Sequence, residues 1–320
     1  MKQKMGNKLM LITLMSLTLP ASAAFAADTD SDRVITSEVG GVEYSFTFEE
    51  APQHAVSSAG YTTEMMLALG LEKQMAGTAY PDNEIDPQFQ EAYDSIPLLS
   101  EKYPSQEQIL DVETDFVTGW LSVFAEDKLS PTFLEKNNIS FYVPLSDTDG
   151  AGIDEVYADF RNLGIIFQVE EKAEEVISSM QEQIAAINEK VSDEEVVKVF
   201  LYDSGEDAPF TAGGSLPTDL ISLAGGENIF GDETDKWLTV QWEAVIDANP
   251  EWVVVMTYSG SEDAQAKIDF MKNTPALQDI EAVKKDQFLV LGLQDVTAGL
   301  RNIGAVQTMA EQFHPEAFEE

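Results

Sequence analysis

The sequence has no cysteine and only two histidines, His54 and His314. Disulfide bonds are therefore excluded, and the fold must be stabilised by packing. The residues also offer no zinc cluster. Basic residues are scarce, since 18 lysines and arginines stand against 58 acids. Nucleic acid is excluded as a partner, because its phosphates require a basic surface.

No apolar stretch is long enough to cross a bilayer as a helix, which takes about twenty residues. The run at 9–19 follows three lysines and is broken by Pro20. Ala24-Phe25-Ala26 then offers the small-x-small pattern that signal peptidase recognises, so residues 1–26 are interpreted as a cleavable signal peptide. The segment has no cysteine to carry a lipid. We therefore expect a free protein of the periplasm and not a lipoprotein.

Cleavage would remove three lysines and leave 15 basic against 58 acidic residues, a formal charge of −43. Such an excess repels itself in the folded state and is tolerated better where salt screens it. We interpret it as adaptation to a saline habitat, with recruitment of cations as the alternative. The acids are interspersed with apolar residues and form no acidic tail, so disorder is not indicated.

The rest of the chain is long enough for two compact domains. Short apolar segments alternate with helical ones, which is typical of a largely parallel sheet. A hairpin is expected around Gly40-Gly41, and a helix over 63–69 that ends at Gly70. The expected strands are 54–58, 75–80, 116–120, 141–145, 196–202, 252–256 and 288–291.

A helical tract without proline, 153–191, separates the two halves and is expected to be interrupted near Gly164 and to restart around Glu170. Its second part keeps apolar residues at helical spacing. Because the tract contains no glycine-serine linker, we interpret it as a rigid strut that allows only a limited hinge. The expected organisation is an N-terminal lobe over 27–152, this tract, and a C-terminal lobe over 192–320.

Two segments that begin 136 positions apart resemble each other. Residues 107–117 read EQILDVETDFV, and residues 243–253 read EAVIDANPEWV. Each predicts a short helix opened by a glutamate and followed by a strand. The repeat favours two similar lobes that face one another. Ligands of open α/β sheets bind beyond the carboxyl ends of the strands, so the cleft between the lobes is the expected site.

Three further motifs accompany the repeated segments: TEMMLALGL at 63–71, PFTAG at 209–213 and LAGGENIF at 223–230. In this order and spacing the chain resembles the helical-backbone class of ABC-importer binding proteins, which includes siderophore, heme and cobalamin carriers. The resemblance implies two Rossmann-like α/β lobes joined by a long rigid helix, with the ligand cleft between them. It also implies a protein that delivers a small molecule to an ABC importer permease. We expect a monomer without a cofactor of its own.

The resemblance assigns Glu107 and Glu243 to permease docking, with one carboxylate from each lobe presented to arginines of the permease. From the residues alone, each glutamate could instead complement the positive end of its helix, an effect of about 0.3–1 kcal/mol. Ser105 and Gln108 resemble a capping box at the first of these helices. The recurrence of the glutamate in both lobes favours docking.

Aromatic residues near strand ends are the expected ligand contacts, because the family packs flat side chains against a macrocycle or chelate at similar points. The candidates are Trp120, Trp237, Phe210, Tyr61 and Tyr80. Burial in the core is the competing interpretation of these rings. It is the favoured one for Trp242 and Trp252, which lie within a predicted helix and a predicted strand.

Arg301 is one of only three arginines, with Arg33 and Arg161. Family members often keep an arginine here that touches the ligand, and a guanidinium can hold a hydroxamate or carboxylate oxygen with paired donors. The alternative is an ion pair with a nearby acid. Both interpretations stay open.

A secreted hydrolase is a remote alternative, since the many carboxylates could supply an acid–base pair for glycoside cleavage. However, the sequence offers no nucleophile elbow, phosphate loop or dinucleotide fingerprint. Among binding functions we expect an iron–siderophore complex of low net charge, such as a ferric hydroxamate, because so acidic a protein disfavours an anionic ferric catecholate. Cobalamin, heme and other metal chelates remain alternatives. Direct capture of a metal by side chains is not indicated.

Overall fold

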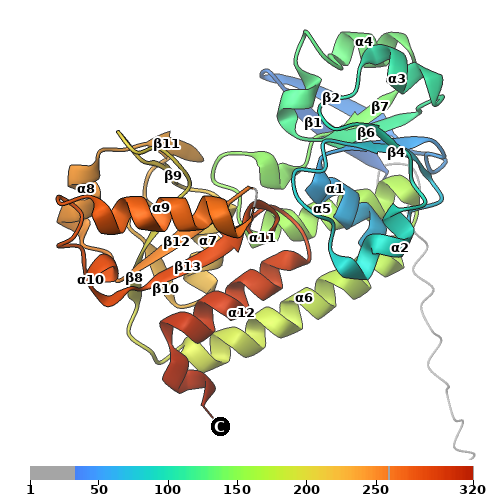
Figure 1. Ribbon diagram of the computed structural model, residues 1–320. Coiled ribbons are helices and arrows are strands. Elements are labelled where there is room, and N and C mark those ends of the chain that lie inside the picture. Colours follow the sequence, from blue (N-terminus) through green and yellow to red (C-terminus); the bar gives the residue numbers. More distant parts are fainter. Residues whose placement is uncertain (1–32, 259, 320) are drawn as a thin grey trace, which may run out of the picture. The chain divides into compact units, whose positions relative to one another are not determined.

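The computed structural model describes residues 33–258 and 260–319, which belong to one compact unit. The expected signal peptide, 1–26, lies outside the described residues. Two separate parallel sheets organise the chain, one before and one after the helical tract (Figure 1). The α/β architecture of two lobes is therefore confirmed. None of the described helices is long and apolar enough to cross a membrane.

The N-terminal sheet has the strand order β5-β4-β3-β6-β7, and all neighbouring strands are parallel. Strands β3 and β6 are buried on both faces, which is why neither contains a charged residue or alternates between polar and apolar positions. The strands are β3 (Ala55–Ser58), β4 (Met75–Ala79), β5 (Leu98–Ser100), β6 (Phe116–Gly119) and β7 (Ser140–Tyr142). The connecting helices are α1 (Gly60–Ala68), α2 (Gln90–Tyr93), α3 (Gln106–Asp111) and α4 (Pro131–Lys136).

Turn chemistry explains where the expected elements of this lobe begin and end. The hairpin of β1 (Val34–Val39) and β2 (Val42–Thr47) is confirmed, and its two turn glycines both have positive φ, as a two-residue hairpin turn requires. The strand expected at 141–145 is too long. Pro144 has no N–H for the ladder, and the chain turns there into the 3-10 helix η3 (Leu145–Asp147).

The C-terminal sheet has the strand order β10-β8-β12-β13, again with parallel neighbours, and a separate antiparallel ribbon pairs β9 with β11. Its strands are β8 (Val197–Tyr202), β9 (Phe210–Ala212), β10 (Gly226–Asn228), β11 (Trp237–Thr239), β12 (Trp252–Thr257) and β13 (Phe288–Gly292). Its helices are α7 (Leu216–Leu223), α8 (Trp242–Ala248), α9 (Ser261–Asn273), α10 (Glu281–Lys285), α11 (Leu293–Val296) and α12 (Arg301–Phe313).

The helical tract consists of α5 (Ile153–Phe167) and α6 (Glu170–Val191). The expected restart around Glu170 is confirmed, but the break lies at Gln168, which has a left-handed backbone with φ of 58°, and not at Gly164. Gly164 stays inside α5. A Cβ there would come within 2.7 Å of the Cβ of Ala173, so this glycine allows α5 and α6 to approach closely.

The long helix α6 buries one apolar stripe and lies alongside α12 (Figure 1). This stripe joins the largest core cluster, which also contains Phe116 and Tyr142 of the N-terminal sheet and Val199 and Val254 of the C-terminal sheet. A single apolar cluster therefore extends from one lobe to the other along the helices. Such a shared core favours the limited hinge that we expect from the sequence.

Candidate ligand-binding site

A cavity of about 340 Å³ is lined by residues that follow strands of both sheets. In the N-terminal sheet β3 lies between β4 and β6, and in the C-terminal sheet β8 lies between β10 and β12. The strand order reverses at both places, and ligands of open α/β sheets bind at such switch points. The volume is at the low end of the usual range for small-molecule sites, about 300–1,000 Å³.

The N-terminal wall of the cavity consists of two aromatic pairs. Tyr61 and Trp120 have ring centroids 4.7 Å apart and planes tilted by 60°. Tyr80 and Tyr103 are stacked, with centroids 4.7 Å apart and planes within 20°. Tyr61 is almost fully buried in α1, where burial is the largest cause that raises its pKa. This wall offers several ring faces held by packing.

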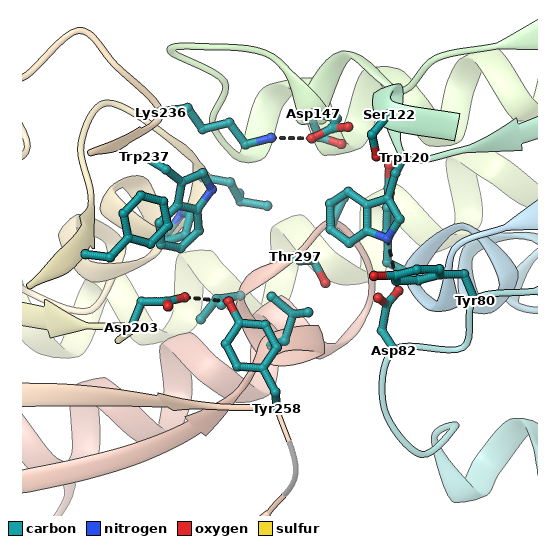
Figure 2. A pocket seen from close by; sticks show the side chains of 18 of the residues that line it. Tyr80, Asp82, Trp120, Ser122, Asp147, Asp203, Lys236, Trp237, Tyr258 and Thr297 are labelled. Carbon is teal, nitrogen blue, oxygen red and sulfur yellow. Dashed lines mark hydrogen bonds and ion pairs between the residues drawn. The ribbon is translucent and has the colours of Figure 1, made fainter. Parts of the chain in front are cut away.

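The C-terminal wall is formed by the β9–β11 ribbon and by Tyr258 after β12. Phe210 pairs in register with Thr239, and Trp237 lies two residues before Thr239, so both rings project from the same face of the ribbon. Their centroids are 5.8 Å apart with planes within 20°. Trp237 and Trp120 lie on opposite sides of the cavity (Figure 2).

Two carboxylates of the cavity hold its aromatic residues. Asp82 accepts hydrogen bonds from the backbone N–H of Gly60 at 3.1 Å and from Nε1–H of Trp120 at 3.0 Å. Burial raises the pKa of Asp82, although these two hydrogen bonds act against the rise. Asp203 accepts a hydrogen bond from the hydroxyl of Tyr258, and burial together with this carboxylate raises the pKa of Tyr258.

The third carboxylate, Asp147, forms an ion pair with Lys236 across the cavity (Figure 2). The side chains are 9% and 21% exposed, so the pair is mostly shielded from water. Asp147 also accepts from the backbone N–H of Leu121 at 2.9 Å. Lys236 precedes Trp237 and Leu121 follows Trp120, so this carboxylate connects the chain beside both tryptophans. The lining as a whole has three carboxylates and one ammonium group.

Five of the six predicted ligand contacts line this cavity. They are Tyr61, Tyr80, Trp120, Phe210 and Trp237. The structure therefore brings them together, and their role in ligand binding stays a prediction. The two tryptophans assigned to the core are half-buried and pack against it, Trp242 against Phe200 and Tyr202, and Trp252 against Phe313.

Arg301 is not part of the cavity lining. Its Nε donates to Glu64 at 2.9 Å, and its Nη2 donates to Glu64 and, at 2.8 Å, to the backbone oxygen of Glu84. The Glu64 side chain is only 6% exposed. This geometry matches the ion-pair interpretation of Arg301, which joins α12 to α1, and not the ligand interpretation.

Glu107 and Glu243 occupy the second position of α3 and α8, and both side chains are exposed. The predicted capping box at α3 is confirmed. Ser105 and Gln108 form it, and Glu107 is not part of it. Within 33–258 and 260–319, neither glutamate side chain has a hydrogen bond or an ion pair. Both carboxylates are therefore accessible to a partner, and permease docking stays a prediction.

Sequence reasoning missed the four charged residues of the cavity and two of its tyrosines: Asp82, Asp147, Asp203, Lys236, Tyr103 and Tyr258. Asp203 and Tyr258 each come directly after a strand of the C-terminal sheet. Inspection of the first polar residue after each strand would have found these two. Asp147 and Lys236 are 89 residues apart, and no local pattern connects them.

Comparison with known proteins gives concordant matches. Residues 56–294 match the family described as periplasmic binding protein. The vitamin B12-binding protein of Pectobacterium atrosepticum is 23% identical over 275 residues, which covers 81% of this chain and 92% of that protein. A periplasmic binding protein from Veillonella parvula is 36% identical, with a TM-score of 0.86 and coverage of 88% and 98%. An ABC-type Fe3+-hydroxamate transport system from Saccharomonospora viridis shares the fold, at 22% identity, a TM-score of 0.72 and coverage of 88% and 99%.

Proposed function

The chain belongs to the periplasmic binding protein family, and we propose that it captures a ferric siderophore of low net charge, of the hydroxamate type, and delivers it to an ABC importer permease. The relatives named above are binding or transport proteins, which supports a carrier and not an enzyme. We further propose that residues 1–26 are cleaved and that the protein acts as a free monomer in the periplasm.

The charge of the cavity is the observation that carries the proposal. Three carboxylates and one ammonium group stand among aromatic rings, and the ammonium group is already paired with Asp147. A ligand between these walls meets a negative potential, which repels anions and tolerates neutral or cationic complexes. Three singly charged hydroxamates neutralise one Fe3+, whereas three catecholates leave a strongly anionic complex. The site therefore suits the hydroxamate class better than ferric catecholates or the carboxylates of heme.

Cobalamin is the second candidate. The vitamin B12-binding relative matches along most of both chains, and the aromatic walls suit a flat corrin ring. The cavity volume of about 340 Å³ argues against a ligand of that size unless the lobes separate further. A compact ferric hydroxamate needs less rearrangement, so we place it first.

A tryptophan-fluorescence titration tests the ligand class. The purified protein is titrated with a ferric trihydroxamate, a ferric triscatecholate, cyanocobalamin and hemin, each at low and high salt. We expect tight binding of the trihydroxamate with little salt dependence, and weak catecholate binding that improves as salt screens the acids. Tight binding of cyanocobalamin or hemin without a response to either iron complex contradicts the proposal. Mass spectrometry of ligand retained after mild purification gives an independent answer.

Delivery to the permease is tested with the double variant Glu107→Ala/Glu243→Ala. Ligand affinity should stay within about twofold, because both side chains are exposed and outside the cavity, whereas uptake through the cognate permease should drop. The matched control, Glu182→Ala/Glu189→Ala, removes the same charge from the exposed face of α6. Transport at the wild-type rate in the first variant would show that the two glutamates act only at their helix starts.

A further inference from the structure

Asp159 is a fully buried acid in α5 that does not line the cavity. Its Oδ1 accepts hydrogen bonds from the hydroxyl of Tyr142 at 2.5 Å and from the backbone N–H of Leu145 at 2.7 Å. Its Oδ2 accepts from the backbone N–H of Ser146 at 3.1 Å. These three donors are neutral, and two of them belong to η3. A buried carboxylate therefore fixes this short turn.

The residue after these two donors is Asp147, which connects the turn to both walls of the cavity. Asp147 accepts from the N–H of Leu121, directly after Trp120, and pairs with Lys236, directly before Trp237. A continuous set of contacts thus leads from the interior of α5, through η3, to the two tryptophans on opposite sides of the cavity.

We propose that Asp159 is a positioning residue of the ligand site, which holds η3 and thereby sets Asp147 and both tryptophan walls. The inference rests on the proposed function in that it takes the cavity as the ligand site, but it requires no particular ligand. Charge-assisted hydrogen bonds are about twice as strong as neutral ones, so the ionised carboxylate is the form that holds the turn best.

Asp159 also makes the site sensitive to pH. Burial raises the pKa of Asp159 to about 6, although the hydrogen bonds that it accepts act against the rise. The ionised carboxylate only accepts, whereas the protonated acid must also donate its own proton, and its hydrogen bonds with the N–H groups of Leu145 and Ser146 are then no longer charge-assisted. Between pH 7.5 and 5 we therefore expect η3 to loosen while the chain stays folded.

The sign of the stability effect agrees with this expectation. A raised carboxyl pKa means that the folded state binds the proton more readily than the unfolded state between about pH 4 and 6. Protonation of Asp159 therefore favours the folded state, and its contribution to stability rises as the pH falls through this window. A loss of ligand affinity there cannot be attributed to unfolding driven by this group.

The elements packed around this part of α5 contribute several charged and titratable side chains, among them Tyr61, Tyr142, Asp147, Lys236, Glu174 and Asp219. Burial, as the largest cause, raises the pKa of each of the two tyrosines, so both stay neutral in the relevant range. Glu174 is engaged with Arg161, and Asp219 accepts from the N–H of Ile153 at the start of α5. Asp159 is thus the acid that contacts η3 directly.

Acrylamide quenching of tryptophan fluorescence in the ligand-free protein tests the positioning role. In the wild type we expect a change in quenching with a midpoint near pH 6, and in Asp159→Asn we expect no such titration. The double variant Trp120→Phe/Trp237→Phe keeps only the two core tryptophans and should lose the signal. This assigns the titration to the cavity.

The matched control is Asp115→Asn. Asp115 also accepts two backbone N–H groups, from Gln53 at 2.7 Å and His54 at 3.0 Å, but it precedes β6 and so lies at the opposite end of that strand from Trp120. This variant should keep the wild-type titration. A wild-type midpoint in Asp159→Asn, or no titration in the wild type, would overturn the inference.

The ligand arm uses a ferric trihydroxamate as the probe. The affinity of the wild type should fall about tenfold to a hundredfold between pH 7.5 and 5, as expected for the loss of a charge-assisted hydrogen bond, whereas Asp159→Asn should bind weakly at both values. If the probe does not bind but the quenching titration behaves as described, the proposed ligand is wrong and the positioning role stands. If Asp159→Asn does not fold, as judged by circular dichroism, Asp147→Ala decides. This variant keeps Asp159 but removes both acceptor oxygens that contact Leu121 and Lys236, so a titration that persists in it contradicts the proposal.

Discussion

Strands β6 and β12 occupy equivalent places in the two lobes, and an aromatic residue of the cavity follows each of them. Trp120 after β6 donates its Nε1–H to Asp82, and Tyr258 after β12 donates its hydroxyl to Asp203. The partners differ in origin. Asp82 follows β4, which is separated from β6 by β3, whereas Asp203 follows β8, the direct neighbour of β12.

The surroundings of the two rings also differ. Trp120 is half-buried and packs against Tyr61, which is 3% exposed, whereas Tyr258 is 46% exposed. Side chains held by packing and by a hydrogen bond lose less freedom when a ligand binds. We infer that the N-terminal wall is pre-organised and supplies most of the binding energy, and that the C-terminal wall adjusts to the ligand.

The largest expected effect concerns the contact between the lobes. Arg301→Ala leaves Glu64 buried without its partner, which should lower the free energy of unfolding by about 3–5 kcal/mol. Urea denaturation measures this change, and ligand affinity should stay nearly constant. The control Arg161→Ala removes an exposed pair with Glu174 and should cost about 0–1 kcal/mol. Reduced ligand affinity with unchanged stability would instead support the ligand interpretation of Arg301.

The next effect separates the two walls. Trp120→Ala should weaken ligand binding by about 2 kcal/mol or more, roughly thirtyfold, because it removes a ring that packing and a hydrogen bond already hold in place. Tyr258→Ala should have a clearly smaller effect, because its ring is 46% exposed and loses more freedom when a ligand binds. Isothermal titration calorimetry compares the two variants. Equal losses contradict a division between a pre-organised and an adjustable wall.

Removal of the positive charge of Lys236 should change the preferred class of ligand more than the total affinity. Lys236→Met leaves Asp147 without its cationic partner. At low salt, the variant should therefore bind a ferric triscatecholate about tenfold more weakly than the wild type does. High salt should reduce this difference, because it screens the carboxylates. Fluorescence titration at two salt concentrations measures both effects. An improved affinity for the anionic complex would show that Lys236 does not compensate the acids.

The smallest expected effect comes from Tyr258→Phe, which keeps the ring and removes the hydroxyl that donates a hydrogen bond to Asp203. Affinity should fall by about 0.5–1.5 kcal/mol, roughly threefold to tenfold. Because burial and Asp203 raise the pKa of Tyr258, its hydroxyl stays protonated at both pH 6 and pH 8, and the difference from wild type should be the same at these two values. A difference that grows with pH in this range would mean that the hydroxyl ionises.

Much of the fold could be predicted because its signals are local. Strand β12 lies within one residue of the limits expected from its residues, and the hairpin turn follows from Gly40-Gly41. Gly164 misled the prediction because a glycine that allows two helices to pack closely resembles a glycine that ends a helix. The aromatic residues of the cavity could also be predicted from the sequence, since the rings lie near strand ends.

The sequence by itself determined the alternation of strands and helices, the two lobes and the aromatic side chains at their facing edges, because periodicity, turn residues and the repeat around Glu107 and Glu243 act over short distances. Only the tertiary structure decided which charges meet. Arg301 pairs with Glu64 across 237 positions of the sequence, and Asp147 pairs with Lys236 across 89. Because the chain has 58 acids, the sequence offers each cationic side chain many chemically equivalent partners. The choice among them depends on which side chains burial brings within reach, and that follows from the packing of the whole unit.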